Sequence, residues 1–392
     1  QNTSPTKENI GIDNIDYNRK NPYMAKIVDS FTISEGSGKE TNHYVFSIKG
    51  SGIRYKSGDA MGLYPKNNAQ LVKDTVRKLK AKLSDKVSTG DMEESTLENA
   101  LLHRFVIHRA GKKFLTMVHE RLGKGKPKRE LEAILSDTEE LEKYLFVRDY
   151  IDIMNEYKVR ISPQEFIDTL SPITPRLYSI SSSPKAHKGE IHLTVAIVKY
   201  NNLDRDRYGL ATGDLAKGIA INETEVPIYI QPTRDFVIPK NGSKDIIMVG
   251  PGTGIAPFRA FLEERKATGA TGKNWLFFGE VHEESTFFYK NELFEYMKEG
   301  VLTKLTTAFS RDQKDKIYVQ DRILSNGKEI WKWLQSGAYF FICGDKQYMA
   351  KDVHKALIKI AEDYGKMKKE DAENYINQTL MKKEHRYLRD VY

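Results

Sequence analysis

Short runs of β-branched and aromatic residues, bounded by turn-forming clusters, occur in two separate parts of the chain. Ala25–Phe31 and His43–Ile48 lie near the beginning, and Glu190–Tyr200 and Glu225–Gln231 lie near the middle. Gly, Ser and Asp residues separate these runs, as is typical of turns between strands. The pattern predicts strands in both parts, although more than a hundred residues separate the two pairs.

The intervening residues, from about 66 to 165, have a different pattern. Apolar positions recur every four residues, first between Leu71 and Leu83 and again between Phe114 and Leu122. That interval places side chains on one face of a helix. We therefore predict a helical insertion whose Leu and Phe residues form a core of their own.

The last part of the chain alternates predicted strands with predicted helices. This order is typical of a parallel, doubly wound sheet with helices on both faces. The predicted segments are the strands Ile246–Val249, Trp275–Phe278, Leu302–Phe309 and Tyr339–Cys343, with helices at Pro257–Arg265 and near Lys290–Lys298.

Composition narrows the function classes. The 392 residues include one cysteine, Cys343, which excludes a disulfide framework and a cysteine-ligated iron–sulfur cluster within this chain. The nine histidines show neither H-x-H nor H-E-x-x-H spacing, so we expect no metal site. The net charge of +8 is modest and dispersed, which favours no nucleic-acid partner, and no apolar run has the length of a membrane span. We expect a cytoplasmic protein.

The strongest local motif is a glycine-rich turn, GPGTGIAPF, at residues 250–258. It follows a predicted buried strand and precedes a predicted helix. Glycines allow a close approach of the backbone to a phosphate, and a helix N-terminus offers free N–H groups. Gly252, Thr253 and Gly254 are therefore candidates for binding a dinucleotide.

A second motif, SRDQKDKIYVQ, follows the strand that ends at Phe309. Arg, Lys, Ser and Tyr side chains suit the extra phosphate of NADP, where an NAD site would prefer an acidic residue. Taken alone, this segment is more typical of a solvated charged loop than of a phosphate site. A third motif, RLYSISSS from Arg176, with the turn at Gly209–Thr212, could hold a pyrophosphate through an arginine and a helix N-terminus. On physical grounds alone, these segments are interpreted as a β-barrel strand and a loop.

Together with the CGD at Cys343, these motifs occur in the order found in the ferredoxin–NADP reductase module of the diflavin reductases. The chain resembles that family over about residues 20–392. Its ending, RYLRDVY, and the segment GKNWLFFG most resemble the flavoproteins of NADPH sulfite reductase. The resemblance implies an antiparallel Greek-key β-barrel that binds FAD, from residues 23–65 and 166–238. It also implies a helical connecting insertion at 66–165 and an α/β NADP-binding domain at 239–392, after a mobile arm at 1–22.

The resemblance also implies roles for individual residues. Catalysis would involve the region of Ser179, Cys343, Asp390 and Tyr392, with Ser179 near the reactive flavin nitrogen and Tyr392 over the flavin face. FAD would be bound by Arg176, Tyr178, Ser179, Thr194, Ala196, Tyr200, Gly209, Leu210, Ala211 and Thr212. NADPH would be bound by Gly252, Thr253, Gly254, Ser310, Arg311, Lys316, Tyr318 and Gln320.

The activity implied is hydride transfer from NADPH to FAD, followed by single-electron transfer to a protein acceptor. That acceptor would be a sulfite reductase haemoprotein, a flavodoxin or FMN domain, or a ferredoxin. The diflavin pattern places an FMN-binding domain before this module, and the chain as given begins at Gln1 without one. Two alternatives stay open, namely a stand-alone ferredoxin or flavodoxin reductase and an interaction protein with a dead site.

Overall fold

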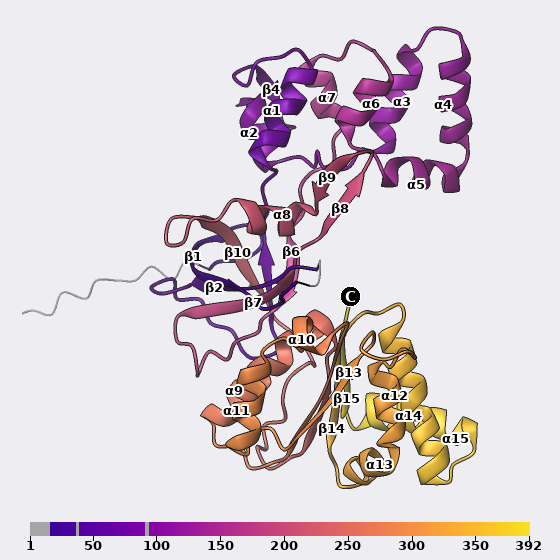
Figure 1. The fold of residues 1–392 in the computed structure, drawn as a ribbon. Coiled ribbons are helices and arrows are strands. Elements are labelled where there is room, and N and C mark those ends of the chain that lie inside the picture. Colours follow the sequence, from indigo (N-terminus) through magenta and orange to yellow (C-terminus); the bar gives the residue numbers. More distant parts are fainter. Residues whose placement is uncertain (1–15, 37–38, 91–93) are drawn as a thin grey trace, which may run out of the picture.

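The computed structural model describes residues 16–36, 39–90 and 94–392. The described chain forms three parts stacked in one direction: a helical part, an antiparallel sheet and an α/β part (Figure 1). Most of the predicted arm, residues 1–15, lies outside the described residues. Residues 16–22 form no helix or strand, and the mobility of the arm stays a prediction.

The middle part is a six-stranded antiparallel sheet that two distant parts of the sequence build, as predicted. Its order is β6-β3-β10-β1-β2-β7. Alternate residues of β7, such as Ile191, Leu193 and Val195, enter its core. An isolated bridge between Ile180 and Leu193 links the two edge strands. The strands are β1 (Tyr23–Thr32), β2 (Thr41–Ser47), β3 (Ala60–Leu63), β6 (Arg176–Ser179), β7 (Glu190–Ala196) and β10 (Glu225–Gln231), and helix α8 (Leu210–Lys217) packs beside them.

The single strand predicted over Glu190–Tyr200 is wrong in its extent. The chain leaves the sheet after Ala196 and forms a separate hairpin, β8 (Lys199–Asn202) and β9 (Arg205–Tyr208). Its tight turn has positive φ angles at Leu203 and Asp204, and alternation of apolar residues alone does not reveal such a turn.

The helical part is the predicted insertion, with a core of its own around Phe114, Tyr150 and Phe166, whose rings meet edge to face. The first predicted helix is shorter than expected. It ends at Lys78, because Lys80 adopts a φ of 55° and turns the chain before Leu83. The elements are α1 (Ala69–Lys78), β4 (Lys86–Ser88), β5 (Glu94–Thr96), α2 (Leu97–His103), α3 (Lys112–Arg121), α4 (Lys126–Ser136), α5 (Thr138–Phe146), α6 (Tyr150–Glu156) and α7 (Pro163–Thr169).

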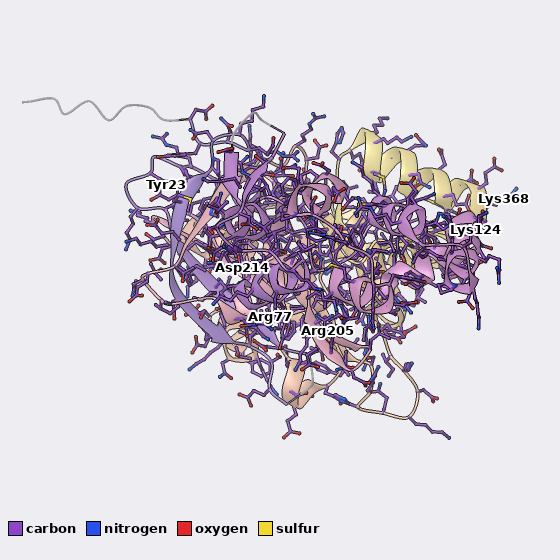
Figure 2. The ribbon with its side chains drawn as sticks, turned by 90° about the horizontal axis from the view of Figure 1, so that it is seen from above. Tyr23, Arg77, Lys124, Arg205, Asp214 and Lys368 are labelled. Carbon is purple, nitrogen blue, oxygen red and sulfur yellow. The ribbon has the colours of Figure 1, made fainter. Side chains whose placement is uncertain are left out.

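Four ion pairs join the insertion to the hairpin, and the two that Arg207 forms are buried. Arg207 contacts Asp149 at 2.8 Å and Asp152 at 2.5 Å, and Arg205 contacts the same two carboxylates at 3.0 and 2.7 Å. The side-chain carboxylates of the two acidic residues also form the capping box of helix α6, in which each accepts the backbone N–H of the other. Figure 2 places Arg205 in the same region as Arg77 and Asp214, where the hairpin, α1 and α8 meet.

Replacing Arg207 by alanine should therefore destabilise the protein strongly. Removing one partner of a buried pair leaves uncompensated charge and typically costs about 3–5 kcal/mol. Lys199 lies on the same hairpin, pairs with Asp206 at 3.5 Å and is exposed, so Lys199→Ala should change stability far less than Arg207→Ala. Chemical denaturation of both variants checks this, and equal effects would contradict it.

The last part is a five-stranded parallel sheet in the order β13-β12-β11-β14-β15, flanked by helices on both faces (Figure 1). The predicted alternation is therefore confirmed, although the fifth strand, β15, was not predicted. The strands are β11 (Ile246–Val249), β12 (Asn274–Glu280), β13 (Lys304–Phe309), β14 (Tyr339–Gly344) and β15 (Tyr387–Val391). The helices are η1 (Gly252–Ile255), α9 (Ala256–Ala267), α10 (Glu283–Thr286), α11 (Lys290–Lys298), α12 (Val319–Ser325), α13 (Gly327–Gln335), α14 (Met349–Gly365), α15 (Lys369–Asn374) and the π-helix η2 (Tyr375–Lys383). Among the described residues, none of the helices has both the length and the apolar character of a membrane span.

Candidate functional site

The end of strand β6 meets the C-terminal edge of the parallel sheet. Ser179, the last residue of β6, donates a hydrogen bond from Oγ to Asp390 Oδ2 at 2.6 Å. Asp390 lies on β15 directly opposite Cys343 of β14, and the Cys343 thiol donates to the same oxygen at 3.8 Å. Ser179 and Cys343, which lie far apart in the sequence, thus donate to one carboxylate oxygen of Asp390.

Cys343 is fully buried in this cluster. Burial, together with the neighbouring Asp390 carboxylate, raises the pKa of the Cys343 thiol well above its usual range. The thiol therefore stays protonated at neutral pH, so it acts as a weak hydrogen-bond donor and not as a nucleophile.

Tyr392 continues from β15 across the same edge of the sheet. Its backbone N–H donates to the Gly344 carbonyl at 3.2 Å, and its hydroxyl lies 3.2 Å from Thr253 Oγ1 in the glycine-rich turn. The side chain is 64% exposed. The ring therefore has a large free surface but a fixed position over the junction.

The glycine-rich turn forms η1 and leads into α9. A Cβ atom at Gly254 would lie 2.2 Å from the Cys343 carbonyl oxygen, and Gly252 has a φ of +57°, so both positions require glycine. No side chain caps the start of η1 or α9. Free N–H groups at such a terminus favour an anion such as a pyrophosphate.

The segment after β13 has a fixed backbone and free cationic side chains. The Ser310 and Arg311 N–H groups donate to the Glu280 and Val281 carbonyls at 2.9 and 3.0 Å, and Asp312 accepts from the Glu283 N–H at 2.8 Å. Arg311 and Lys316 are exposed, and neither forms an ion pair within the described part of the chain. Tyr318 is the N-cap residue of α12, and Gln320 lies in its first turn. These side chains are available to a phosphate.

The residues predicted to bind FAD lie on the sheet and on α8. Arg176 is exposed on β6, and Tyr178 is partly buried against the sheet core, where burial raises the pKa of its hydroxyl to about 12. Gly209 begins α8 without a side-chain cap, so the N–H groups at this end are free to bind an anion. Leu210, Ala211 and Thr212 are buried, which leaves chiefly their backbone to contact a ligand.

Three residues predicted to bind FAD have surroundings that the sequence did not indicate. Thr194 faces the α/β part, where its Oγ1 atom lies 2.7 Å from the hydroxyl of the half-buried Tyr289. Ala196 ends β7 on the same face, and Tyr200 lies on the β8–β9 hairpin opposite Arg207. Their roles toward FAD stay predictions.

A cavity of about 430 Å³ lies beside the start of α8, and the sequence did not predict it. Its lining includes His108, Asn68, Tyr208 and Gly209. The Nδ1 atom of His108 is buried without a hydrogen-bond partner. An unpaired buried nitrogen beside a free helix terminus fits a ligand with anionic and polar groups, such as the FAD pyrophosphate. No spacing marks His108, because it reaches this cavity through the tertiary fold.

His108 should make the FAD-free protein sensitive to acid. Burial first, and then the charges of Arg176 and Arg109, lower the pKa of His108 to about 4. In the unfolded chain, His108 binds a proton near pH 6.5. The stability that depends on the neutral His108 is therefore fully present above pH 6.5 and is lost as the pH falls toward 4. We expect the free energy of unfolding to fall by about 2–3 kcal/mol between pH 6.5 and 4, and we expect no such fall in His108→Gln. Denaturation at several pH values measures it, and bound FAD should shrink the difference if its pyrophosphate lies near His108.

Two parts of the chain match models of known protein families. Residues 15–213 match the family model of the FAD binding domain, and residues 248–355 match that of the oxidoreductase NAD-binding domain. The first match covers about half of the chain. The chain therefore belongs to the FAD binding domain family, and it combines that domain with an oxidoreductase NAD-binding domain.

Individual relatives give a more specific likeness than the two family models. The chain is 40% identical over 379 residues to the sulfite reductase [NADPH] flavoprotein alpha-component of Mannheimia succiniciproducens, with 96% of this chain and 62% of the relative covered. It is 40% identical to the protein of the same name from Vibrio parahaemolyticus, with 96% and 59% covered, and 39% identical to that from Bacillus subtilis, with 96% and 62% covered. The chain thus spans about three fifths of the length of these relatives. The predicted family is confirmed.

Proposed function

We propose that this chain is the FAD- and NADPH-binding part of a sulfite reductase flavoprotein. The proposal is carried by the contact between Ser179 and Asp390, which joins the FAD-binding sheet to the NAD-binding sheet at the edge where parallel sheets bind ligands. The names of the relatives support the choice of sulfite reductase. The antiparallel sheet would be a Greek-key barrel, since the bridge from Ile180 to Leu193 joins its edges.

Each cofactor has a group of residues that fits it. FAD would be held by Arg176, by the free start of α8 and by the cavity beside His108. NADPH would be held by the glycine-rich turn and by the cationic segment that follows β13. When bound, FAD supplies the ability to accept a hydride and release its electrons one at a time.

The residues of this chain would position the reaction. Asp390 fixes the Ser179 hydroxyl and adds a negative charge next to it, and Cys343 places a neutral thiol on the same carboxylate. Tyr392 would cover the junction until the nicotinamide binds. The acceptor is proposed to be the haemoprotein of the sulfite reductase.

The proposal is tested with purified, FAD-loaded protein. NADPH should bleach the flavin under anaerobic conditions, and the protein should reduce ferricyanide but consume no sulfite without a partner. Stopped-flow oxidation of the reduced protein by a sulfite reductase haemoprotein, a flavodoxin and a ferredoxin then distinguishes the acceptors. Fastest oxidation by ferredoxin would favour the stand-alone reductase. Failure of NADPH to bleach the flavin would favour the interaction protein with a dead site, which the intact Ser179–Asp390 contact argues against.

A further inference from the structure

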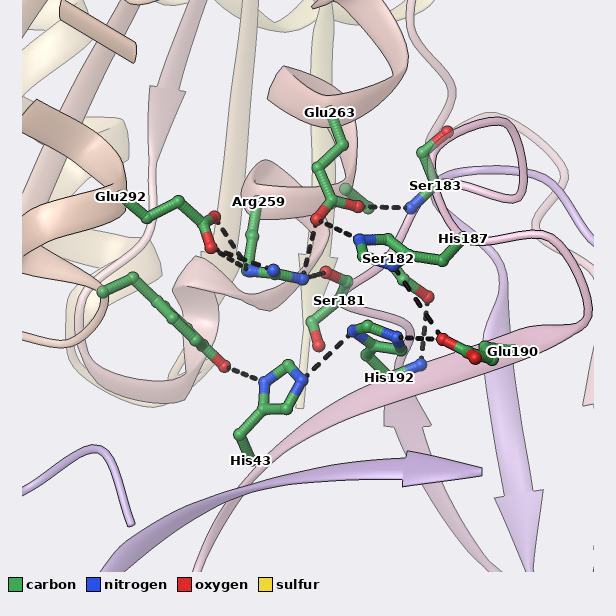
Figure 3. Close-up of polar contacts among 12 residues, drawn as sticks. His43, Ser181, Ser182, Ser183, His187, Glu190, His192, Arg259, Glu263 and Glu292 are labelled. Atoms are coloured by element: carbon green, nitrogen blue, oxygen red, sulfur yellow. Dashed lines mark hydrogen bonds and ion pairs between the residues drawn. The ribbon is translucent and has the colours of Figure 1, made fainter. Parts of the chain in front are cut away.

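A cluster of histidine and glutamate side chains lies where the FAD-binding sheet meets helices α9 and α11 (Figure 3). Ile191 and Leu193 of β7 enter the sheet core, so Glu190 and His192 project from the opposite face of the strand. His187 comes from the turn before β7. The three side chains converge because that turn, at Gly189, has a φ of +77°.

The three side chains place one ligand atom each around a common point. His192 Nε2 lies 3.3 Å from Glu190 Oε2, and His187 Nδ1 lies 3.9 Å from the same oxygen. All three atoms lie within 4.8 Å of one another. Zinc binds His and Glu at about 2.0–2.2 Å in tetrahedral geometry, so its ligand atoms stand about 3.3 Å apart. Small side-chain rotations would give this spacing.

The outer nitrogen of each imidazole is held by a hydrogen bond. His187 Nε2 lies 3.0 Å from Glu263 Oε1 on α9, and His192 Nδ1 lies 3.1 Å from His43 Nε2. A histidine that binds a metal usually donates its other N–H to a carboxylate or another acceptor, which fixes its tautomer and orientation. Both imidazoles meet this condition, and their inner nitrogens face Glu190 (Figure 3).

The donors and acceptors of this hydrogen-bond network have partners whether His192 Nε2 carries a proton or binds a cation. Without a cation, His192 Nε2–H donates to Glu190, and His43 Nε2–H donates to His192 Nδ1. With a cation on Nε2, the His192 proton is on Nδ1 and is donated to His43. The His43 proton then moves to Nδ1, which lies 2.8 Å from the Tyr289 hydroxyl, and that hydroxyl donates to Thr194. The two neutral imidazoles change tautomer, and no net proton is released.

We propose that His187, Glu190 and His192 bind one divalent transition-metal ion, with Zn²⁺ the best fit. Two imidazoles and one carboxylate suit zinc, and water would complete the tetrahedron. The side chains of His187 and Glu190 are 31% and 28% exposed, which gives the ion and the water a path. The prediction of no metal site was based on the lack of H-x-H and H-E-x-x-H spacings. These three residues have a different spacing, H-x-x-E-x-H, so that prediction did not cover them.

The ion would also fix the two cofactor domains to each other. Glu263 orients His187 from the NAD-binding part, and its other oxygen accepts the Ser183 N–H of the FAD-binding part at 2.7 Å. Arg259 contacts Glu263 at 2.9 Å and donates to the Ser181 carbonyl at 2.8 Å. Zinc has no redox chemistry, so the site would stabilise this interface and take no part in electron transfer.

The test uses the FAD-loaded protein without a polyhistidine tag, freed of metal by chelation. Titration calorimetry with Zn²⁺, and visible absorbance with Co²⁺, should show one ion per chain. His187→Gln and Glu190→Gln should each weaken binding at least about tenfold. Glu263→Gln should weaken it about tenfold or more although it supplies no ligand. His385→Asn, at an exposed histidine elsewhere, should leave the affinity unchanged.

Zn²⁺ should also raise the melting temperature of the parent protein but not that of His187→Gln. His187 and Glu190 are partly exposed, and FAD content with circular dichroism shows that both variants are folded. If the parent protein binds Zn²⁺ no more tightly than His187→Gln and Glu190→Gln, the cluster is not a metal site. Unchanged affinity in Glu263→Gln would overturn the link between the domains.

Discussion

Replacing Asp390 by asparagine should slow the reduction of bound flavin by NADPH about 100-fold. The nicotinamide gains a positive charge as it loses a hydride, and the Asp390 carboxylate lies at the junction where the two cofactor domains meet. Asparagine keeps the size and one acceptor oxygen but removes the negative charge. Stopped-flow measurement of flavin bleaching gives the rate directly, while FAD content and melting temperature should change little.

Ser179→Ala separates the charge from the hydrogen bond. This variant keeps the carboxylate and loses only the 2.6 Å contact, so we expect a smaller decrease of about tenfold, near the value of one hydrogen bond to a charged group. Because the two residues act as one unit, the double variant should be slower by less than the product of the single effects. Flavin reduction at the parent rate in Asp390→Asn would show that the carboxylate only links the domains.

Much of the fold could be predicted because its signals are local. The strand at Ile246–Val249 and the helix at Lys290–Lys298 have the predicted bounds, since a buried strand and an amphipathic helix each follow from spacing within the segment. The β8–β9 hairpin and the strand Tyr387–Val391 were missed. The first depends on two residues with positive φ, and the second is stabilised by pairing with β14, about 45 residues away.

The residues of the candidate site also include some that local sequence motifs indicated and others that they did not. The motifs place Ser179 and Cys343 on predicted strands. The unpredicted strand β15 brings Asp390 opposite Cys343 by parallel pairing, so only the family resemblance grouped the three residues beforehand. His108 and the His187–Glu190–His192 cluster had no such signal. His108 reaches its cavity from the helical insertion. The cluster depends on Glu263 and His43, which lie far from it in sequence.

Arg311→Ala should raise the KM for NADPH roughly tenfold to a hundredfold and leave the KM for NADH nearly unchanged. The backbone of this segment is fixed by its bonds to the Glu280 and Val281 carbonyls, so the substitution removes the guanidinium without moving the loop. A hydrogen bond to a charged group contributes about 1.5–3 kcal/mol, which corresponds to this range of affinity. NADH lacks the extra phosphate and has no such contact to lose.

Lys314 provides the matched control, because it is an exposed cation of the same segment that is not assigned to the phosphate. Lys314→Ala lowers the net charge by the same amount, so any long-range attraction of the anionic cofactor falls equally in both variants. Steady-state kinetics with both nucleotides, at low and high salt, distinguish the two effects, since long-range attraction is screened and a direct contact is screened much less. Equal losses with NADPH and NADH in Arg311→Ala would place the phosphate elsewhere. Equal losses in the two variants would reduce the role of Arg311 to general attraction. A loss confined to NADPH and to Arg311→Ala would identify the guanidinium as the group that distinguishes the two nucleotides.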